Sequence, residues 1–254
     1  MNKDHYNNLP MPPSMIVLLG GVLSVLIVYP VNFAAIRAMG SLPALIITVP
    51  VEEMAKVIGL VFLLVRSPKI LKSKTQGVKL GGLAGLAFGL CETVISRSGV
   101  LGMILSTPLH ILCSGLVGIG LVFSAGQRKE QDEISLSTVI NQETLLFLLI
   151  AIGLHFMYNF LAFTLREVGL IIGFSGTVAV FLLLYNSLPS EADAMSGTSV
   201  FGLLSNAFRA GPSSLKREPR KINFCSECGS RTKEGSLFCH RCGKKLETEE
   251  QEKK

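Results

Sequence analysis

The stretch PALIITVPVEEMAKVIGLVFLLV, residues 43–65, decides how the rest of the sequence is interpreted. It is long enough to cross a membrane, because about 20 apolar residues span the hydrocarbon layer as a helix. Yet Glu52, Glu53 and Lys56 lie near its middle. On insertion scales, one ionisable side chain at a helix centre costs about 2.5 to 3.5 kcal/mol. Three of them in one span indicate either a functional site or a buried structural ion pair.

The flanking sequence has the same apolar character. Hydrophobic residues make up 49% of the 254 residues and charged residues only 17%, a balance typical of membrane proteins. The long apolar stretches of the sequence contain only four of the 42 Asp, Glu, Lys and Arg residues, namely Glu52, Glu53, Lys56 and Glu92. We therefore expect an all-α polytopic membrane protein with about six transmembrane helices. The candidate spans are 15–36, 43–65, 80–96, 99–125, 144–165 and 168–187.

Lys and Arg in the short loops predict the orientation of these spans. The loop at 66–79 carries five of them and the loop at 126–143 carries two. The loops on the opposite side carry one each, at Arg37, Arg97 and Arg166. Basic loops stay in the cytoplasm, so both termini are expected there, in a multi-pass protein of the cell membrane. The net charge of +6 reflects mainly this bias and does not indicate nucleic-acid binding.

The composition also divides the chain into segments. A tail at 1–14 precedes the helical domain at 15–187. Residues 188–221 are rich in Ser, Gly, Pro and charge and are typical of a linker, in which 199–208 has one apolar helical face. That stretch fits either a helix on the membrane surface or a transient linker helix. A cysteine-containing segment at 222–247 and a charged tail at 248–254 follow.

The segment at 222–247 has the spacing of a zinc ribbon. Two C-x2-C pairs, ten residues apart, supply Cys225, Cys228, Cys239 and Cys242, and Gly229 and Gly243 let the chain turn after each pair. Four thiolates at this spacing suit tetrahedral Zn²⁺. A segment this short cannot bury a sufficient core, so the metal would supply the folding energy. Disulfides are the competing interpretation, but a cytoplasmic tail is reducing. A closed four-cysteine site indicates a structural role or the docking of a protein partner.

The polar residues inside the spans fall at one predicted depth. They form four clusters: Glu52, Glu53 and Lys56; Glu92; His110; and His155 with Asn159. At 1.5 Å per residue, Glu52, Glu92 and His155 lie about 12 to 13 Å below the outer boundary, and His110 about 16 Å. Pro50 and Pro108 each precede a polar residue by two positions, and each can open its helix to water. We therefore expect one polar pocket between four helices.

Carboxylates and imidazoles in such a pocket suit an activated water. A glutamate takes a proton from water, and nearby donors stabilise the oxyanion that forms when water attacks a carbonyl. The same side chains could hold a divalent metal, although no H-E-x-x-H is present and no G-x-S-x-G stands in a span. A transporter or proton relay also needs ionisable residues at the midplane, and a non-catalytic scaffold with a docking ribbon is a third class.

These motifs resemble the PrsW-type intramembrane proteases, which are related to the type II CAAX prenyl endopeptidases and the bacterial ABI proteins. The likeness rests on Glu-Glu-x-x-Lys at 52–56, Phe-Gly-x-x-Glu at 88–92, His110, and His-x-x-x-Asn at 155–159. It covers about 15–187 and implies an endopeptidase that cleaves membrane-anchored proteins within the lipid bilayer.

The resemblance also implies a role for each of these residues. Glu52 or Glu53 would be the base, and Glu92 and His110 would orient the water or complete a metal site. His155 and Asn159 would hold the oxyanion, and Lys56 would balance the charge of the carboxylates. The acidic residue that relatives often carry at the last position is an asparagine here, Asn159, which leaves the role of that position open.

Overall fold

The computed structural model describes residues 11–67, 70–96, 100–126, 139 and 141–188, and in the C-terminal part 223–224, 227, 231–232, 238 and 241–244. The chain divides into two units, Met1–Asn206 and Ala207–Lys254. Their boundary falls inside the linker predicted at 188–221. The stretch predicted to be helical at 199–208 and the charged tail at 248–254 lie outside the described residues.

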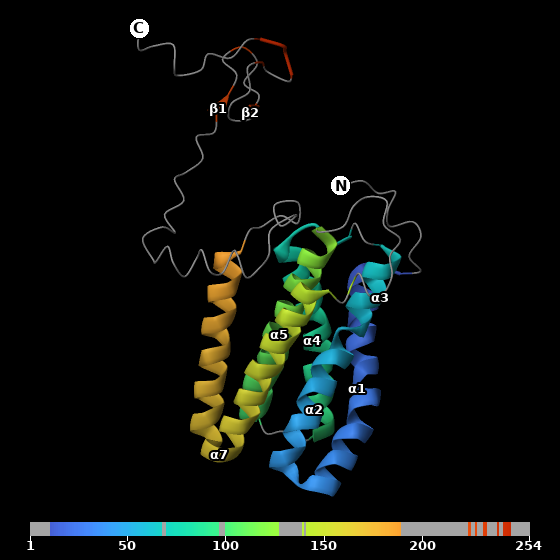
Figure 1. Ribbon diagram of the computed structural model, residues 1–254, viewed down its shortest axis with the longest axis vertical. Helices are drawn as coiled ribbons and strands as arrows, with labels where there is room; N and C mark the ends of the chain where they lie inside the picture. The colour runs from blue at the N-terminus through green and yellow to red at the C-terminus, as the bar shows by residue number, and fades with distance from the viewer. Residues whose placement is uncertain are drawn as a thin grey trace. The chain divides into compact units, whose positions relative to one another are not determined.

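The first unit is a bundle of helices whose order in space differs from their order in the chain (Figure 1). Contacts run from α1 to α4, from α4 to α5, from α5 to α7, from α7 to α2 and back from α2 to α1. These pairs close a ring, so residues on the inner faces of five helices can meet. The helices are α1 (Pro13–Met39), α2 (Ser41–Lys56), α3 (Ile58–Arg66), α4 (Lys74–Ser96), α5 (Val100–Gly126) and α7 (Gln142–Ser187).

Within the described residues, four helices are long and apolar enough to cross a membrane: α1, α4, α5 and α7. The span predicted at 43–65 is not one helix, because the chain breaks at Val57 into α2 and α3. The 16 residues of α2 extend only about 24 Å, which is less than the hydrocarbon core. The prediction that Pro50 opens the helix before the carboxylates is wrong, because α2 continues through Pro50 and ends after them.

The spans predicted at 144–165 and 168–187 belong to the single element α7, which folds back on itself. A straight helix of its 46 residues would extend about 69 Å, more than twice the hydrocarbon core. Arg166 interrupts it with φ 54° and ψ −129°. Past this turn the two halves touch, since a Cβ on Gly173 would lie 2.9 Å from Tyr158 Cα. Figure 1 shows the two antiparallel halves.

Glycines bring α4 and α5 into backbone contact, as the sequence GGLAGLAFG leads us to expect. A Cβ on Gly81 or Gly85 would collide with a backbone carbonyl of α5, that of Ser114 or His110 respectively. A Cβ on Gly89 would lie 3.1 Å from Thr107 Cα. Small residues permit this close approach of membrane helices. The backbone of His110 is therefore fixed against α4.

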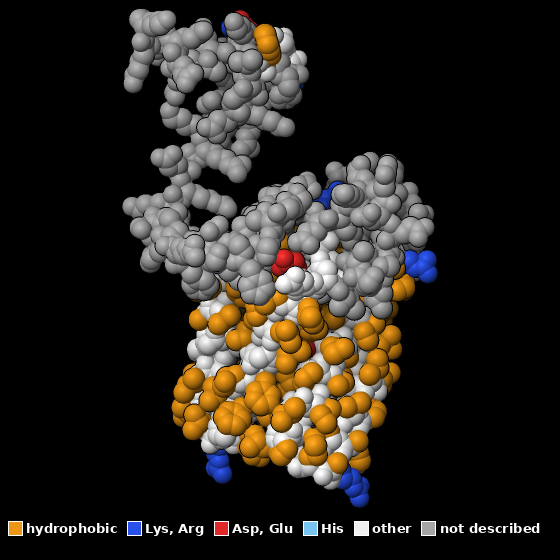
Figure 2. Space-filling view, in the orientation of Figure 1, with side chains coloured by type: hydrophobic (Ala, Val, Ile, Leu, Met, Phe, Trp, Pro, Cys, Tyr) orange, Lys and Arg blue, Asp and Glu red, His pale blue; other side chains and the backbone are white. Residues whose placement is uncertain are grey.

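The exterior of this bundle is apolar. Large side chains such as Leu26, Phe33 and Ile46 are more than half exposed, with exposed fractions of 69%, 58% and 68%. Figure 2 shows hydrophobic side chains over the helices, with Lys and Arg only towards the two ends of the bundle on the face shown. Apolar patches of this extent are not stable in water, and they suit a lipid environment.

The second unit contains a short antiparallel pair of strands, β1 (Asn223–Phe224) and β2 (Arg231–Thr232). Asn223 pairs with Thr232, and Phe224 pairs with Arg231. Of the four cysteines predicted to bind zinc, Cys242 is described, in a turn, and Cys225, Cys228 and Cys239 lie outside the described residues. Gly243 has φ +73°, which fits the turn expected after the second C-x2-C pair.

Candidate active site

Two residues of α2 form a buried ion pair at the centre of the bundle. Lys56 Nζ lies 2.5 Å from Glu53 Oε1, and both side chains have no exposed surface. Residues three or four apart on a helix share a face, so Lys56 has both Glu52 and Glu53 within reach. The spacing alone favours Glu52 as the partner that shares its face, but the structure pairs Lys56 directly with Glu53.

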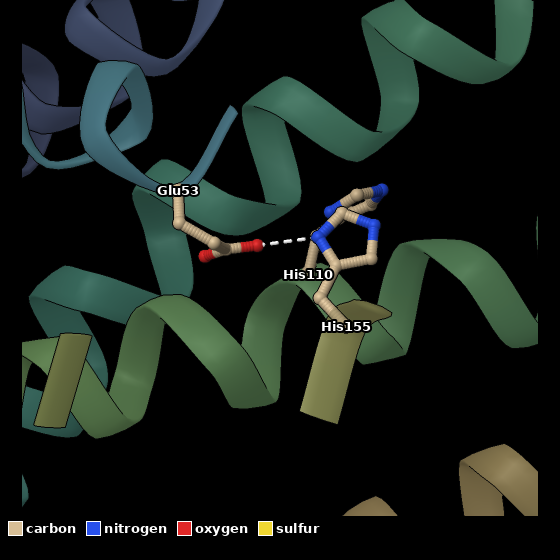
Figure 3. A group of neighbouring side chains, drawn as sticks. All are labelled: Glu53, His110 and His155. Carbon is tan, nitrogen blue, oxygen red and sulfur yellow. Dashed lines mark hydrogen bonds and ion pairs between the residues drawn. The ribbon is translucent and has the colours of Figure 1, made fainter. Parts of the chain in front are cut away.

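His155 of α7 joins both glutamates of α2. Its Nδ1 lies 2.6 Å from Glu53 Oε1 (Figure 3). Its Nε2 lies 3.6 Å from Glu52 Oε2. The first distance is a hydrogen bond, whereas the second is too long for one. Glu53 Oε1 thus accepts hydrogen bonds from both His155 and Lys56. Glu52 Oε2 faces the other edge of the same imidazole ring.

His110 of α5 extends the network to α4. Its Nδ1 lies 2.9 Å from Lys56 Nζ, and its Nε2 lies 2.7 Å from Glu92 Oε2. A charged lysine has only donors, so His110 Nδ1 must accept and Nε2 must carry the proton. His110 Nε2 therefore donates to Glu92. The resulting chain of hydrogen bonds runs from Glu92 through His110, Lys56 and Glu53 to His155.

Aromatic packing holds the cation of this network in place. The Phe88 ring lies 4.9 Å from Lys56 Nζ and 5.1 Å from the His110 ring. The rings of His110 and His155 lie 4.9 Å apart at 86°, edge to face. A desolvated ammonium above an aromatic face gains about 2 kcal/mol. Phe88 also begins the Phe-Gly-x-x-Glu motif, so the motif supplies both this ring and Glu92.

Asn32 of α1 is a site residue that the sequence analysis missed. Its Nδ2 donates to Glu52 Oε1 at 2.7 Å. Asparagine is uncharged, so a search for ionisable residues in the spans passes over it. A signal was nevertheless present, because Asn32 follows Pro30 by two residues, as Glu52 follows Pro50 and His110 follows Pro108.

Asn159 does not touch His155 through any described hydrogen bond, but it lines a cavity beside Glu52. This cavity has a volume of about 410 Å³ and lies between α1, α2 and α7. Its polar lining comes from Asn32, Ser41, Thr48, Glu52 and Asn159. Ser41 begins α2, at the α1–α2 turn, so the lining extends from the end of the bundle to Glu52. We call this space the polar cavity.

Two carboxylate oxygens of the site lack a protein donor. Among the described residues, Glu52 Oε2 and Glu53 Oε2 are buried without a hydrogen-bond partner. A buried carboxylate oxygen is costly unless something donates to it. Of the two glutamates, Glu52 is the one that lines the polar cavity.

Glu53, His110 and His155 supply the donor types of a metal site. One ligand atom from each lies within 4.8 Å of the others. Lys56 Nζ, however, is already bonded to Glu53 Oε1 and to His110 Nδ1. A divalent ion that used these atoms would stand next to a buried ammonium, and like charges at this range repel strongly. As arranged here, the site therefore does not fit a metal ion.

The fold and the site together define a class: a helical membrane protein with buried carboxylates and imidazoles that meet beside a polar cavity. Residues 13–185 match the PrsW family of intramembrane metalloproteases. The chain belongs to this family. No curated protein and no solved structure matches the chain. The family membership establishes an intramembrane protease in general, as the motifs at 52–56 and 88–92 predicted.

Proposed function

We propose that the protein hydrolyses peptide bonds of membrane-anchored substrates with a water molecule activated by Glu52. One observation carries this choice between the two glutamates. Glu52 lines the polar cavity; its Oε1 is held by Asn32, while its Oε2 has no hydrogen-bond partner among the described residues and lies 3.6 Å from His155 Nε2. Glu53 has no exposed surface, and one of its oxygens is occupied by Lys56 and His155.

The proposed reaction begins with water in the polar cavity. Glu52 Oε2 takes one proton from the water as the water oxygen attacks the carbonyl carbon, and the carbonyl electrons move to its oxygen. When this oxyanion collapses, the C=O bond forms again and the C–N bond breaks. The proton on Glu52 passes to the leaving nitrogen. The products are a carboxylic acid and an amine, and Glu52 is restored.

The other residues act around this step. Glu53 orients His155 through the 2.6 Å hydrogen bond, so that the Nε2 edge of the ring faces Glu52 and the attacking water. Asn159 borders the same cavity and would donate its amide N–H to the oxyanion. His110 Nδ1 accepts from Lys56, and Glu92 holds His110 through the other ring nitrogen.

The resident cation of the proposed mechanism is Lys56. The family is named for a metal, and Glu53, His110 and His155 are the residues that would hold one if Lys56 were displaced. Lys56 already supplies a positive charge at Glu53 Oε1 and His110 Nδ1. It offsets the negative charge of the buried Glu52 and Glu53, which a lipid environment penalises.

We also propose six membrane crossings with both termini in the cytoplasm. The short helices α2 and α3 follow each other with one residue between them and together span 25 residues, from Ser41 to Arg66 without Val57. The two halves of α7 supply two further crossings on either side of Arg166. Lys and Arg are concentrated in the loops of one side, which supports this orientation.

For the C-terminal unit we propose a zinc ribbon that docks a protein partner. Glu227 lies between Cys225 and Cys228, and Lys244 follows Cys242 by two residues. Lys244 Nζ lies 3.0 Å from Glu227 Oε1, which supports a contact between the segments that contain these two residues. Four thiolates at the spacing of the two C-x2-C pairs would bind Zn²⁺.

The experiment that tests the proposed reaction compares Glu52→Gln with Glu167→Gln, an exposed glutamate of α7, in purified protein and a membrane-anchored peptide. General-base catalysis contributes about 10² to 10⁴ in rate, so Glu52→Gln should lower kcat by that factor while Glu167→Gln leaves it unchanged. Cleavage that survives in the Glu52→Gln, Glu53→Gln double variant contradicts the mechanism. Loss of ion flux across vesicles in these variants, without any cleavage, would favour a proton relay.

A further inference from the structure

A second cavity lies between α1 and α4 and shares Asn32 and Ile36 with the lining of the polar cavity. It has a volume of about 320 Å³, and we call it the apolar cavity. Its floor consists of Val25, Val28 and Phe88, which are 5%, 3% and 1% exposed. Its rim includes Tyr29 and Phe33, which are 54% and 58% exposed on the outer surface of α1. The cavity is therefore open toward lipid and apolar inside.

The residues with polar groups that line the apolar cavity are Tyr29, Asn32, Glu92 and Ser96, and two of them, Asn32 and Glu92, touch the candidate active site directly. Asn32 Nδ2 donates to Glu52 Oε1 at 2.7 Å, and Glu92 Oε2 accepts from His110 Nε2 at 2.7 Å. A group bound in this cavity would thus lie next to the reacting atoms. Asn32 also lines the polar cavity, so it stands between the two spaces.

Asn32, which lines this cavity, carries one acceptor that no described residue uses. Among the described residues, Asn32 Oδ1 is buried and has no hydrogen-bond partner. Because the amide nitrogen of Asn32 donates to Glu52, the amide oxygen of Asn32 points away from Glu52. A peptide that unwinds for cleavage exposes backbone N–H groups, and each of them needs an acceptor in a lipid environment. Asn32 Oδ1 supplies such an acceptor.

We propose that the apolar cavity binds one apolar side chain of the substrate beside the scissile bond, while Asn32 Oδ1 accepts a backbone N–H of the substrate. This inference rests on the proposed protease function and adds the substrate subsite to it. Water reaches Glu52 through the polar cavity, and the substrate enters from lipid between α1 and α4. The volume fits one large side chain with the adjacent backbone, and six of the ten lining residues have no polar side-chain group, so an apolar side chain fits better than a polar one.

The size of the subsite is tested with full-length protein and a series of membrane-anchored peptides. The cleaved bond is first mapped by mass spectrometry, and the flanking residue is then varied from Ala to Val, Leu and Phe. In an apolar pocket, one methylene group of the substrate changes kcat/KM by about 10- to 200-fold. The wild type should therefore favour Leu or Phe over Ala at one flanking position by at least about tenfold in kcat/KM. Val28→Phe should abolish that preference, and Val28→Ala should strengthen it for Phe.

Leu26→Phe is the matched control, because Leu26 is 69% exposed on the same helix and does not line the cavity. It should keep the wild-type order of peptides. If Val28→Phe and Val28→Ala both leave that order unchanged, the apolar cavity is not the subsite. A uniform loss over all four peptides in the folded Val28→Ala variant also contradicts the subsite.

The hydrogen bond from the substrate is tested with a peptide in which an ester replaces one amide next to the cleaved bond. Loss of one hydrogen bond should raise KM about fivefold in the wild type. In Asn32→Leu the amide and ester peptides should have the same KM. An equal ester effect in both proteins contradicts the role of Asn32. If no cleavage depends on Glu52, the proposed function fails and this inference with it; Glu52-dependent cleavage that ignores Val28 overturns the subsite alone.

Discussion

Lys56 Nζ lies 2.5 Å from Glu53 Oε1 in a part of the bundle where neither side chain has exposed surface. Charges removed from water are stabilised only by their partners, so each member of this pair depends on the other. Glu52, by contrast, is held by the neutral amide of Asn32 and borders a cavity. Substitutions of Glu52 and of Glu53 should therefore affect the protein differently, although the two residues are adjacent in one motif.

We predict that Glu53→Gln destabilises the protein more than Glu52→Gln does. The first change leaves Lys56 buried beside a neutral amide, and a broken buried pair costs about 3 to 5 kcal/mol. Thermal unfolding in detergent measures the difference. The double variant Glu53→Gln, Lys56→Met should recover most of the lost stability, because it removes the unpaired charge. Equal melting temperatures for the two single variants would count against the pairing.

We predict that Gly85→Ala impairs cleavage by moving His110. A Cβ at position 85 collides with the carbonyl of His110, so α5 must shift away from α4 and His110 must leave Glu92. Gly153→Ala is the matched control, because nothing lies within 4 Å of a Cβ there. Rate measurements should show at least a tenfold loss for Gly85→Ala. The control should keep its activity and gain up to about 1 kcal/mol of stability. Equal activity in both variants contradicts the helix contact.

We predict that the helical unit without the C-terminal cysteines contains less than one divalent metal ion per chain. The ammonium group of Lys56 is already bonded to Glu53 Oε1 and His110 Nδ1, so these two atoms are not available as metal ligands. Elemental analysis measures the metal content of protein that ends after residue 190, which lacks the ribbon and therefore any zinc bound there. Lys56→Met in the same shortened chain should raise the metal content, since the repulsion is removed. One tightly bound ion per wild-type chain would show that Lys56 moves aside.

We predict that a chain ending after residue 190 cleaves a generic peptide as fast as the full-length protein. The position of the cut matters, because Lys74 Nζ donates to Leu188 O at 2.7 Å and also to Tyr185 O. A cut at the predicted domain boundary, 187, removes one of these carbonyls. A chain that ends after residue 184 removes both and should unfold at lower temperature. Complete loss of cleavage in the well-folded 190-residue chain would assign the C-terminal unit a part in catalysis.

We predict that the full-length protein binds one Zn²⁺ through the C-terminal unit. Cys242→Ser should lower the zinc content by one per chain, because a thiolate ligand is lost. Cobalt substitution, followed by absorption spectroscopy, reports a tetrahedral thiolate site in the wild type. Cys91→Ser, which alters a cysteine in α4, is the control and should keep the metal. A zinc content unaffected by Cys242→Ser contradicts the ribbon.

Much of the site could be predicted from the sequence because lipid makes polar residues conspicuous. Glu52, Glu92, His110 and His155 stand out in apolar spans, and helical rise placed them at similar depth. Asn32 was missed because it carries no charge. The exact partners could not be predicted either, since Lys56 has two glutamates within reach on its own helix and only the position of His110 and His155 selects Glu53.

The helix boundaries were less predictable. The sequence at 43–65 is long enough for one span, so its length gave no reason to expect the break at Val57, although Gly59 follows that break by two residues. In the structure, α3 packs against α1, where a Cβ on Gly59 would lie 3.2 Å from Gly20 Cα. The turn at Arg166, by contrast, falls in the gap between the predicted spans 144–165 and 168–187, although Arg166 adopts a positive φ that favours glycine. The break at Val57 therefore depends on contacts between helices that the span prediction does not contain.

The sequence by itself determined a helical membrane protein with ionisable residues at one level and a four-cysteine tail, because hydrophobicity and helical periodicity are local properties. Only the tertiary structure decided which glutamate faces the polar cavity and which is paired with Lys56. It alone revealed Asn32 between two cavities. Such choices depend on distances between helices far apart in the chain, and these are set by the packing of side chains that no single segment contains.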